Sequence, residues 1–270
     1  MSEIFPRAPL AMVVAEIRFG YSPTLENRNV QAQVLERLSG YVPVLRRNIQ
    51  EAHTIEIGGT EPVHGKQTMD VLEATAVDGQ TTIAISAETI TIAMSGQAYG
   101  HYDKSLRPLI EDSVRALCAA VPNLYTTRTG LRYLDEIRVP VPPSDVSGWA
   151  KWITPELLGG TRLLADEVEG AAKGMRSTWH YLLPKERQVV LNLGPFFGSG
   201  VIGPGHPFHR ESAPEHMFVL DVDVSRAPAS PESLNADGLL SNYDDLHQPA
   251  HRVFSAALTD EARRLFRGMQ

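Results

Sequence analysis

The chain has 270 residues, of which 43% are hydrophobic and 21% charged, a composition typical of a folded globular protein. Its formal net charge of −7 at pH 7 argues against non-specific binding to nucleic acid, which needs clustered lysine and arginine. A lone cysteine, Cys118, and the lack of a recognisable signal peptide or membrane-spanning run lead us to expect a cytoplasmic protein without membrane contact.

The first half of the chain predicts a strand, a helix, several antiparallel strands and a long helix. The strands are predicted at residues 9–20, 53–59 and 68–96, and the helices at 29–42 and 101–123. Within the strand region, the sequence VDGQ predicts a hairpin turn, because an Asp-Gly pair readily supplies positive φ. Pro108 is expected near the first turn of the long helix, where its missing N–H costs least.

The second half repeats this order of elements. We predict a strand, a short helix split at Pro155, a hairpin, a strand and a closing helix or helix pair, at residues 129–140, 146–160, 174–196, 216–226 and 242–269. The expected fold is therefore α+β, with two similar halves formed by internal duplication. Each half, 1–125 and 126–270, is an antiparallel sheet with covering helices, and the two sheets can join into one. Free edge strands also predict a homodimer.

The strand TGLRYLDEIRVP, residues 129–140, carries four charges near the middle of the chain. Period 2 places Arg132 and Arg138 on one face, and Arg128 extends that face. One interpretation is a solvent-facing ladder of opposite charges. The other is a groove that binds a carboxylate or phosphate through the arginine forks, with Arg128, Arg132, Arg138 and Tyr133 as candidate contacts for an anionic ligand or a protein partner.

Asp135 is the unusual residue of this strand, because it shares its face with Leu131, Tyr133 and Ile137. A buried carboxylate needs a partner. We expect Asp135 to pair with an arginine of a neighbouring strand, such as Arg18.

Two further groups of residues have the chemistry of metal ligands. Asp221 and Asp223 are two apart on a predicted strand, and their oxygens suit Mg²⁺ or Mn²⁺. His247 and His251 are four apart, a spacing used for zinc on a helix, although Pro249 lies between them. The blander interpretations are a strand with solvent-facing carboxylates, and an amphipathic helix capped near Asp244 and Asp245.

Residues 194–216 form a long segment with five glycines and four prolines. Its length and aromatic content are typical of a flap or of a partner-binding loop, and a poorly ordered surface loop is the alternative. The sequence contains no nucleophile elbow, phosphate-binding loop or dinucleotide-binding glycine fingerprint.

The stretches RTGLRYLDEIRVP, PLAMVVAEIRF, FVLDVDV and LHQPAHRVFSAALTDEARRLFRG together resemble a sporadically distributed family of uncharacterised bacterial proteins. The resemblance spans most of the chain and keeps the order of the motifs, while the middle of each half matches poorly. It implies a bacterial origin and an accessory gene, and it carries no established activity or catalytic residue.

We therefore expect a non-enzymatic binding or regulatory protein of bacterial accessory genes, such as defence or toxin–antitoxin genes, without a required cofactor. The alternative is a metal-dependent hydrolase that uses Asp221 and Asp223 with His247 and His251. A third hypothesis is a cavity between sheet and helices that binds a small molecule.

Overall fold

The computed structural model describes residues 5–56, 63–159, 170–203, 206, 208, 209 and 212–268, and for 47–56 and 63–70 it describes the backbone alone. The strands are β1 (Leu10–Phe19), β2 (Val44–Glu56), β3 (Val63–Thr75), β4 (Thr81–Ile85), β5 (Thr89–Ser95), β6 (Tyr125–Ile137), β7 (Ser177–Leu183), β8 (Arg187–Gly198), β9 (Glu215–Arg226) and β10 (Glu232–Ser233). The end of the predicted strand 53–59, residues 57–59, lies outside the described residues.

The helices are α1 (Pro23–Glu26), α2 (Arg28–Glu36), α3 (Gly96–Tyr99), η1 (Tyr102–Leu106), α4 (Arg107–Ala120), η2 (Ser147–Lys151), η3 (Pro155–Leu158), α6 (Ala236–Ala257) and α7 (Asp260–Phe266). Pro108 lies in the first turn of α4, as predicted. The predicted short helix is split at Pro155 into η2 and η3, and the predicted closing helix is the pair α6 and α7. In the described part of the chain, no helix combines the length and apolar character needed to cross a membrane.

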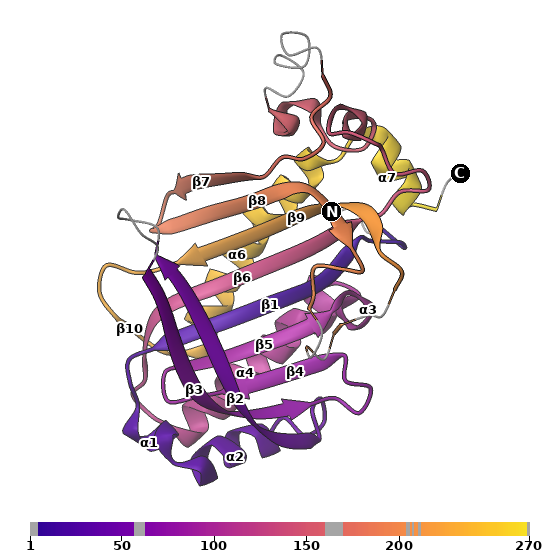
Figure 1. Ribbon diagram of the computed structural model, residues 1–270. Coiled ribbons are helices and arrows are strands. Elements are labelled where there is room, and N and C mark those ends of the chain that lie inside the picture. The colour runs from indigo at the N-terminus through magenta and orange to yellow at the C-terminus, as the bar shows by residue number, and fades with distance from the viewer. Residues whose placement is uncertain are drawn as a thin grey trace.

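All ten strands belong to one sheet, whose order is β2-β3-β4-β5-β1-β6-β9-β8-β7, with β10 paired to the start of β6 (Figure 1). Every pairing is antiparallel. The protein therefore has an α+β fold, in which β1 and β6 form the centre of the sheet.

The two long helices α4 and α6 lie behind the sheet in Figure 1 and cover one of its faces. We call this the helix-covered face and the opposite one the open face. Apolar side chains of β1 and β6, such as Val13, Ile17 and Leu131, are fully buried in the core on the helix-covered face. The alternation of strand side chains sends Glu16 and Arg132 to the open face.

Turn chemistry fixes the hairpins where the sequence predicted them. Gly79 has a φ of +70° in the turn between β3 and β4. Three residues, 184–186, connect β7 to β8, and two of them, Lys185 and Glu186, have positive φ values of +61° and +56°.

Pro249 lies inside α6 and not in its first turn, because Asn235 caps the helix fourteen residues earlier through its side chain. Asp244 and Asp245 are therefore interior helix residues and not caps. A proline cannot donate to the carbonyl four residues before it, here that of Asp245. Arg187 of β8 donates to this carbonyl instead, over 2.8 Å.

Candidate functional site

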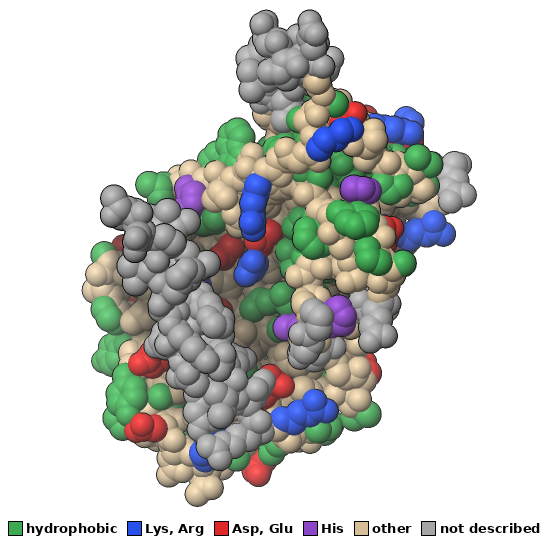
Figure 2. Space-filling model, in the orientation of Figure 1, with side chains coloured by type: hydrophobic (Ala, Val, Ile, Leu, Met, Phe, Trp, Pro, Cys, Tyr) green, Lys and Arg blue, Asp and Glu red, His purple; other side chains and the backbone are tan. Residues whose placement is uncertain are grey.

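The predicted arginine face forms a ladder of ion pairs across the open face. Arg132 donates two hydrogen bonds to Asp221, of 2.7 and 2.9 Å. Arg128 donates to Glu16 over 2.6 Å and lies 3.5 Å from Asp223. Figure 2 shows acidic and basic side chains gathered in the hollowed middle of this face. Because carboxylates already occupy these arginine forks, an incoming anion would have to displace them.

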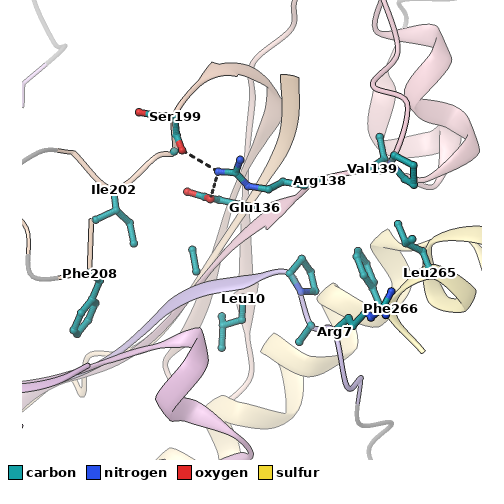
Figure 3. Close-up of a pocket in the computed structure, with 15 residues that line it drawn as sticks. Arg7, Leu10, Glu136, Arg138, Val139, Ser199, Ile202, Phe208, Leu265 and Phe266 are labelled. Carbon is teal, nitrogen blue, oxygen red and sulfur yellow. Dashed lines mark hydrogen bonds and ion pairs between the residues drawn. The ribbon is translucent and has the colours of Figure 1, made fainter. Parts of the chain in front are cut away.

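Arg138 fastens the long segment 194–216 to the sheet. It contacts Glu215, donates to Glu136 over 2.7 Å and donates to the carbonyl of Ser199 over 3.0 Å (Figure 3). Ile202 and Phe208 are buried on a small apolar patch of the open face. Ile202 and Phe208 thus attach the segment to the open face, and its two ends, 194–198 and 215–216, belong to β8 and β9.

The structure does not bring the four candidate metal ligands together. Asp221 contacts Arg132 on the open face, whereas His247 contacts Tyr133, the neighbour of Arg132, on the helix-covered face. The sheet therefore separates the carboxylates from the histidines. Among the described residues, no group of three or more His, Cys, Asp or Glu side chains is placed to hold a metal ion.

A cavity of about 520 Å³ lies on the helix-covered face, between the sheet and α6. Four segments far apart in sequence line it, and they lie at residues 5–10, 96–101, 133–135 and 247–254. Phe5, Tyr99, Tyr133 and Phe254 give it aromatic walls. Its size and its mixture of apolar walls with a few polar groups are typical of small-molecule sites.

Tyr133 joins the polar groups of this cavity into a chain. Its hydroxyl lies 2.9 Å from Nδ1 of His247 and 3.2 Å from the hydroxyl of Tyr99. The His247 ring stacks on Tyr102, with centroids 4.1 Å apart and planes 7° from parallel. Tyr102 in turn donates to Asp244. These contacts hold the His247 ring in one orientation towards the cavity.

Burial keeps the hydrogen-bonded side chains of this cavity, Tyr99, Tyr133 and His247, uncharged. It raises the pKa of Tyr99 to about 12 and that of Tyr133 well above its ordinary value. Burial also lowers the pKa of His247 to about 4, with a further contribution from His251. At neutral pH the cavity therefore offers hydroxyls and a neutral imidazole, which donate and accept hydrogen bonds.

Asp135 lines the same cavity and is only 3% exposed. In the described part of the chain, no hydrogen bond or ion pair joins its carboxyl to another group. The predicted pairing with Arg18 is wrong: β1 and β6 are antiparallel in a register that sets Arg18 beside Arg128 and Asp135 beside Leu10. Burial, with the nearby Asp221 charge, raises the pKa of Asp135 to about 8.

A second cavity of about 410 Å³ lies between the start of β1, the segment after β8 and α7 (Figure 3). In its lining, Glu136 and Arg138 form a half-buried ion pair, and the two side chains also bind the backbone of Val201 and Ser199. Arg7, Ala8 and Leu10 line both cavities, so the segment before β1 separates them.

Of the predicted contact residues, Arg128, Arg132 and Arg138 lie on the open face, and Tyr133 lies on the other. Of the predicted metal ligands, His247 and His251 line the cavity with Tyr133. Sequence reasoning missed the part of the lining that comes from residues 5–10. The sequence did contain one signal for the cavity, which is Asp135, a carboxylate on the apolar face of a strand.

Comparison with known proteins found no family model and no curated protein that matches this chain.

Proposed function

We propose that the protein binds a small organic molecule in the cavity between the sheet and α6, with Asp135 as the central polar contact. This keeps the expectation of a non-enzymatic binding protein from a bacterial accessory gene, acting in the cytoplasm, and moves its site from the arginines to the cavity. One observation carries the proposal: a carboxyl group that is 3% exposed faces the cavity and has no partner among the described residues. Such a group costs stability unless something pairs with it.

The surroundings of Asp135 support the same proposal. The neighbouring hydroxyls of Tyr99 and Tyr133 already bind each other and His247. The aromatic and apolar walls would remove a bound molecule from water, which strengthens each polar contact inside the cavity.

The test fills part of the cavity with a larger side chain on α6. Ala250 lines the cavity and is 2% exposed, whereas Ala256 is an exposed residue of the same helix. A fragment library of cations, anions and neutral molecules is screened by ligand-observed NMR. Fragments that bind the wild type should bind Ala256→Leu and lose binding to Ala250→Leu, with folding checked by thermal unfolding. Equal binding to both variants, or no fragment that binds, would reject the cavity as the site.

We also propose that β7 pairs with β7 of a second copy to form a homodimer. This edge strand carries no charged side chain, and Trp179, Tyr181 and Leu182 are 39%, 43% and 87% exposed. Edge strands are normally protected by charge. Leu182→Lys should reduce the mass measured by light scattering to that of a monomer, whereas Val77→Lys, at another exposed apolar position, should not. A monomeric wild type would contradict the proposal.

The two halves of the chain, 1–125 and 126–270, are proposed to be duplicates. What supports this is a common order of pairing: the first strand of each half pairs with its last long strand, β1 with β5 and β6 with β9. In each half a long helix, α4 or α6, follows these strands. A profile comparison of the two halves across homologous sequences tests the duplication, and dissimilar profiles would count against it.

A further inference from the structure

Among the described residues, no cation is paired with the acidic group in the interior of the cavity. Asp135 lies within it, and the remaining titratable lining residues are Arg7, His101, His247, His251, Tyr99 and Tyr133. Arg7 belongs to the exposed segment before β1. Water screens its charge there, so it does not neutralise a carboxylate in the interior.

The aromatic walls add a second property that favours positive charge. Tyr99 and Tyr133 lie edge to face, with centroids 5.8 Å apart, and Phe5 and Phe254 meet in a similar way at 6.1 Å. The faces of such rings carry partial negative charge and attract cations, most strongly when water is excluded.

Anions and neutral molecules fit less well. Asp135 can meet a carboxylate or phosphate only as an uncharged acid, which gives no charge pairing, and its ionised form would repel the anion in a poorly hydrated space. His247 cannot compensate, because its ring is stacked on Tyr102 and held by Tyr133 in a buried, uncharged state. A neutral molecule can satisfy the carboxyl group but gains nothing from the rings beyond contact area.

We propose that the ligand is a small organic cation, an amine with an apolar or aromatic body, whose ammonium group pairs with Asp135. This rests on the proposed function and specifies its ligand class. The ammonium donates hydrogen bonds to the carboxylate, and the apolar body lies against Phe5, Leu10 and Phe254.

Binding of this kind releases a proton. The amine arrives as an ammonium ion, and the carboxyl group of Asp135 gives its proton to the solvent as the ion pair forms. At about pH 6, where both the free amine and the free carboxyl group are protonated, close to one proton should be released for each molecule bound. A neutral ligand releases none.

The experiment compares three probes of the same shape: 2-phenylethylammonium, 2-phenylethanol and 3-phenylpropionate. Affinities are measured by NMR titration, and proton release by calorimetry in buffers of different ionisation enthalpy. The ammonium should bind at least ~10-fold more tightly than the alcohol, equivalent to about 1.4 kcal/mol, and the carboxylate most weakly. Asp135→Asn, which keeps the shape and removes the charge, should abolish the preference and the proton release. Asp237→Asn, a carboxylate exposed at the start of α6, serves as the control.

The outcomes separate this inference from the proposed function. If the alcohol binds as tightly as the ammonium and Asp135→Asn changes neither, the ligand class is wrong and the cavity remains the site. If the ammonium binds Ala250→Leu as tightly as the wild type, its site lies elsewhere and both proposals fail. If the ammonium does not bind at all, the inference is overturned.

Discussion

Asp135 and Asp221 lie on the paired strands β6 and β9 but on opposite faces of the sheet, and Asp221 has the arginine that Asp135 lacks. In the register of these strands, Leu134 faces Asp221, and Asp135 faces Leu220. Arg132 binds both oxygens of Asp221. The charge of Asp221 adds to the effect of burial in raising the pKa of Asp135. Asp221 is thus paired on the open face, whereas Asp135 faces the cavity on the helix-covered face.

The pH dependence of stability should report on Asp135. Its pKa is about 8 in the folded protein and about 3.9 in an unfolded chain, so between these values the folded state binds more protons. The free energy of unfolding should therefore fall as the pH rises through this range, by up to ~1.4 kcal/mol per pH unit. Asp135→Asn removes this contribution. Urea unfolding at several pH values should show that the free energy of unfolding of the variant rises relative to that of the wild type as the pH increases.

His247 acts in the opposite direction, so the comparison must be made between variant and wild type. Its pKa of about 4 lies below its ordinary value, and the unfolded chain takes up a proton that the folded protein does not. This lowers stability as the pH falls below about 6.5, equally in both proteins. A difference between them that stays constant with pH would mean that Asp135 ionises normally.

Removing Arg132 should lower the free energy of unfolding, because Asp221 would then be a buried carboxylate without a charged partner. In Arg132→Ala, Asp221, which is 6% exposed, keeps the hydrogen bond from Asn192 as its one side-chain contact of this kind within the described part of the protein. We expect a loss of about 1–3 kcal/mol in the free energy of unfolding. The double variant Arg132→Ala/Asp221→Asn should lose less than the sum of its single variants.

The matched control for this ladder is Lys185→Ala, which breaks the exposed pair with Asp245. An exposed pair contributes less than about 1 kcal/mol. Chemical unfolding of the four proteins gives the comparison, and a loss in Arg132→Ala no larger than in Lys185→Ala would show that Asp221 does not depend on its partner.

Gly96 should tolerate no side chain. A Cβ at this position would lie 1.7 Å from the carbonyl oxygen of Leu10, whereas one at Gly40 would meet nothing within 4 Å. Gly96→Ala must push α3 away from β1, and we expect a cost of about 1–3 kcal/mol, with Gly40→Ala near neutral. Because Gly96 and Leu10 both line the cavity, fragment binding should change as well. Equal melting temperatures for the two variants would contradict this close approach.

Much of the fold follows from local pattern. The alternation of apolar residues located β1 and β9 almost to the residue, because each of these strands has one face in the core. Helix limits were less accurate. The helix predicted at 29–42 is Arg28–Glu36, and the one predicted from residue 242 begins at Ala236. In both, an asparagine outside the predicted range provides the cap, Asn27 and Asn235 respectively.

The site was predictable only in part, because it depends on strand register and on contacts between distant segments. Period 2 correctly placed Asp135 and Tyr133 on the apolar face of β6. It could not reveal that Arg18 meets Arg128, since both arginines occur on strands whose relative register is set by the whole sheet. Nor could spacing alone show that Pro249 continues α6, which keeps His247 and His251 in one helix beside the cavity.

The hydrogen bond from Arg187 to the carbonyl of Asp245 makes the strand β8 part of the internal bonding of α6. Where the proline interrupts the helix, the missing bond is supplied from the sheet, two residues before His247. A shift of α6 along β8 would therefore leave the Asp245 carbonyl without its donor, so this one bond favours a single position of the helix, and of His247 on it, relative to the strand.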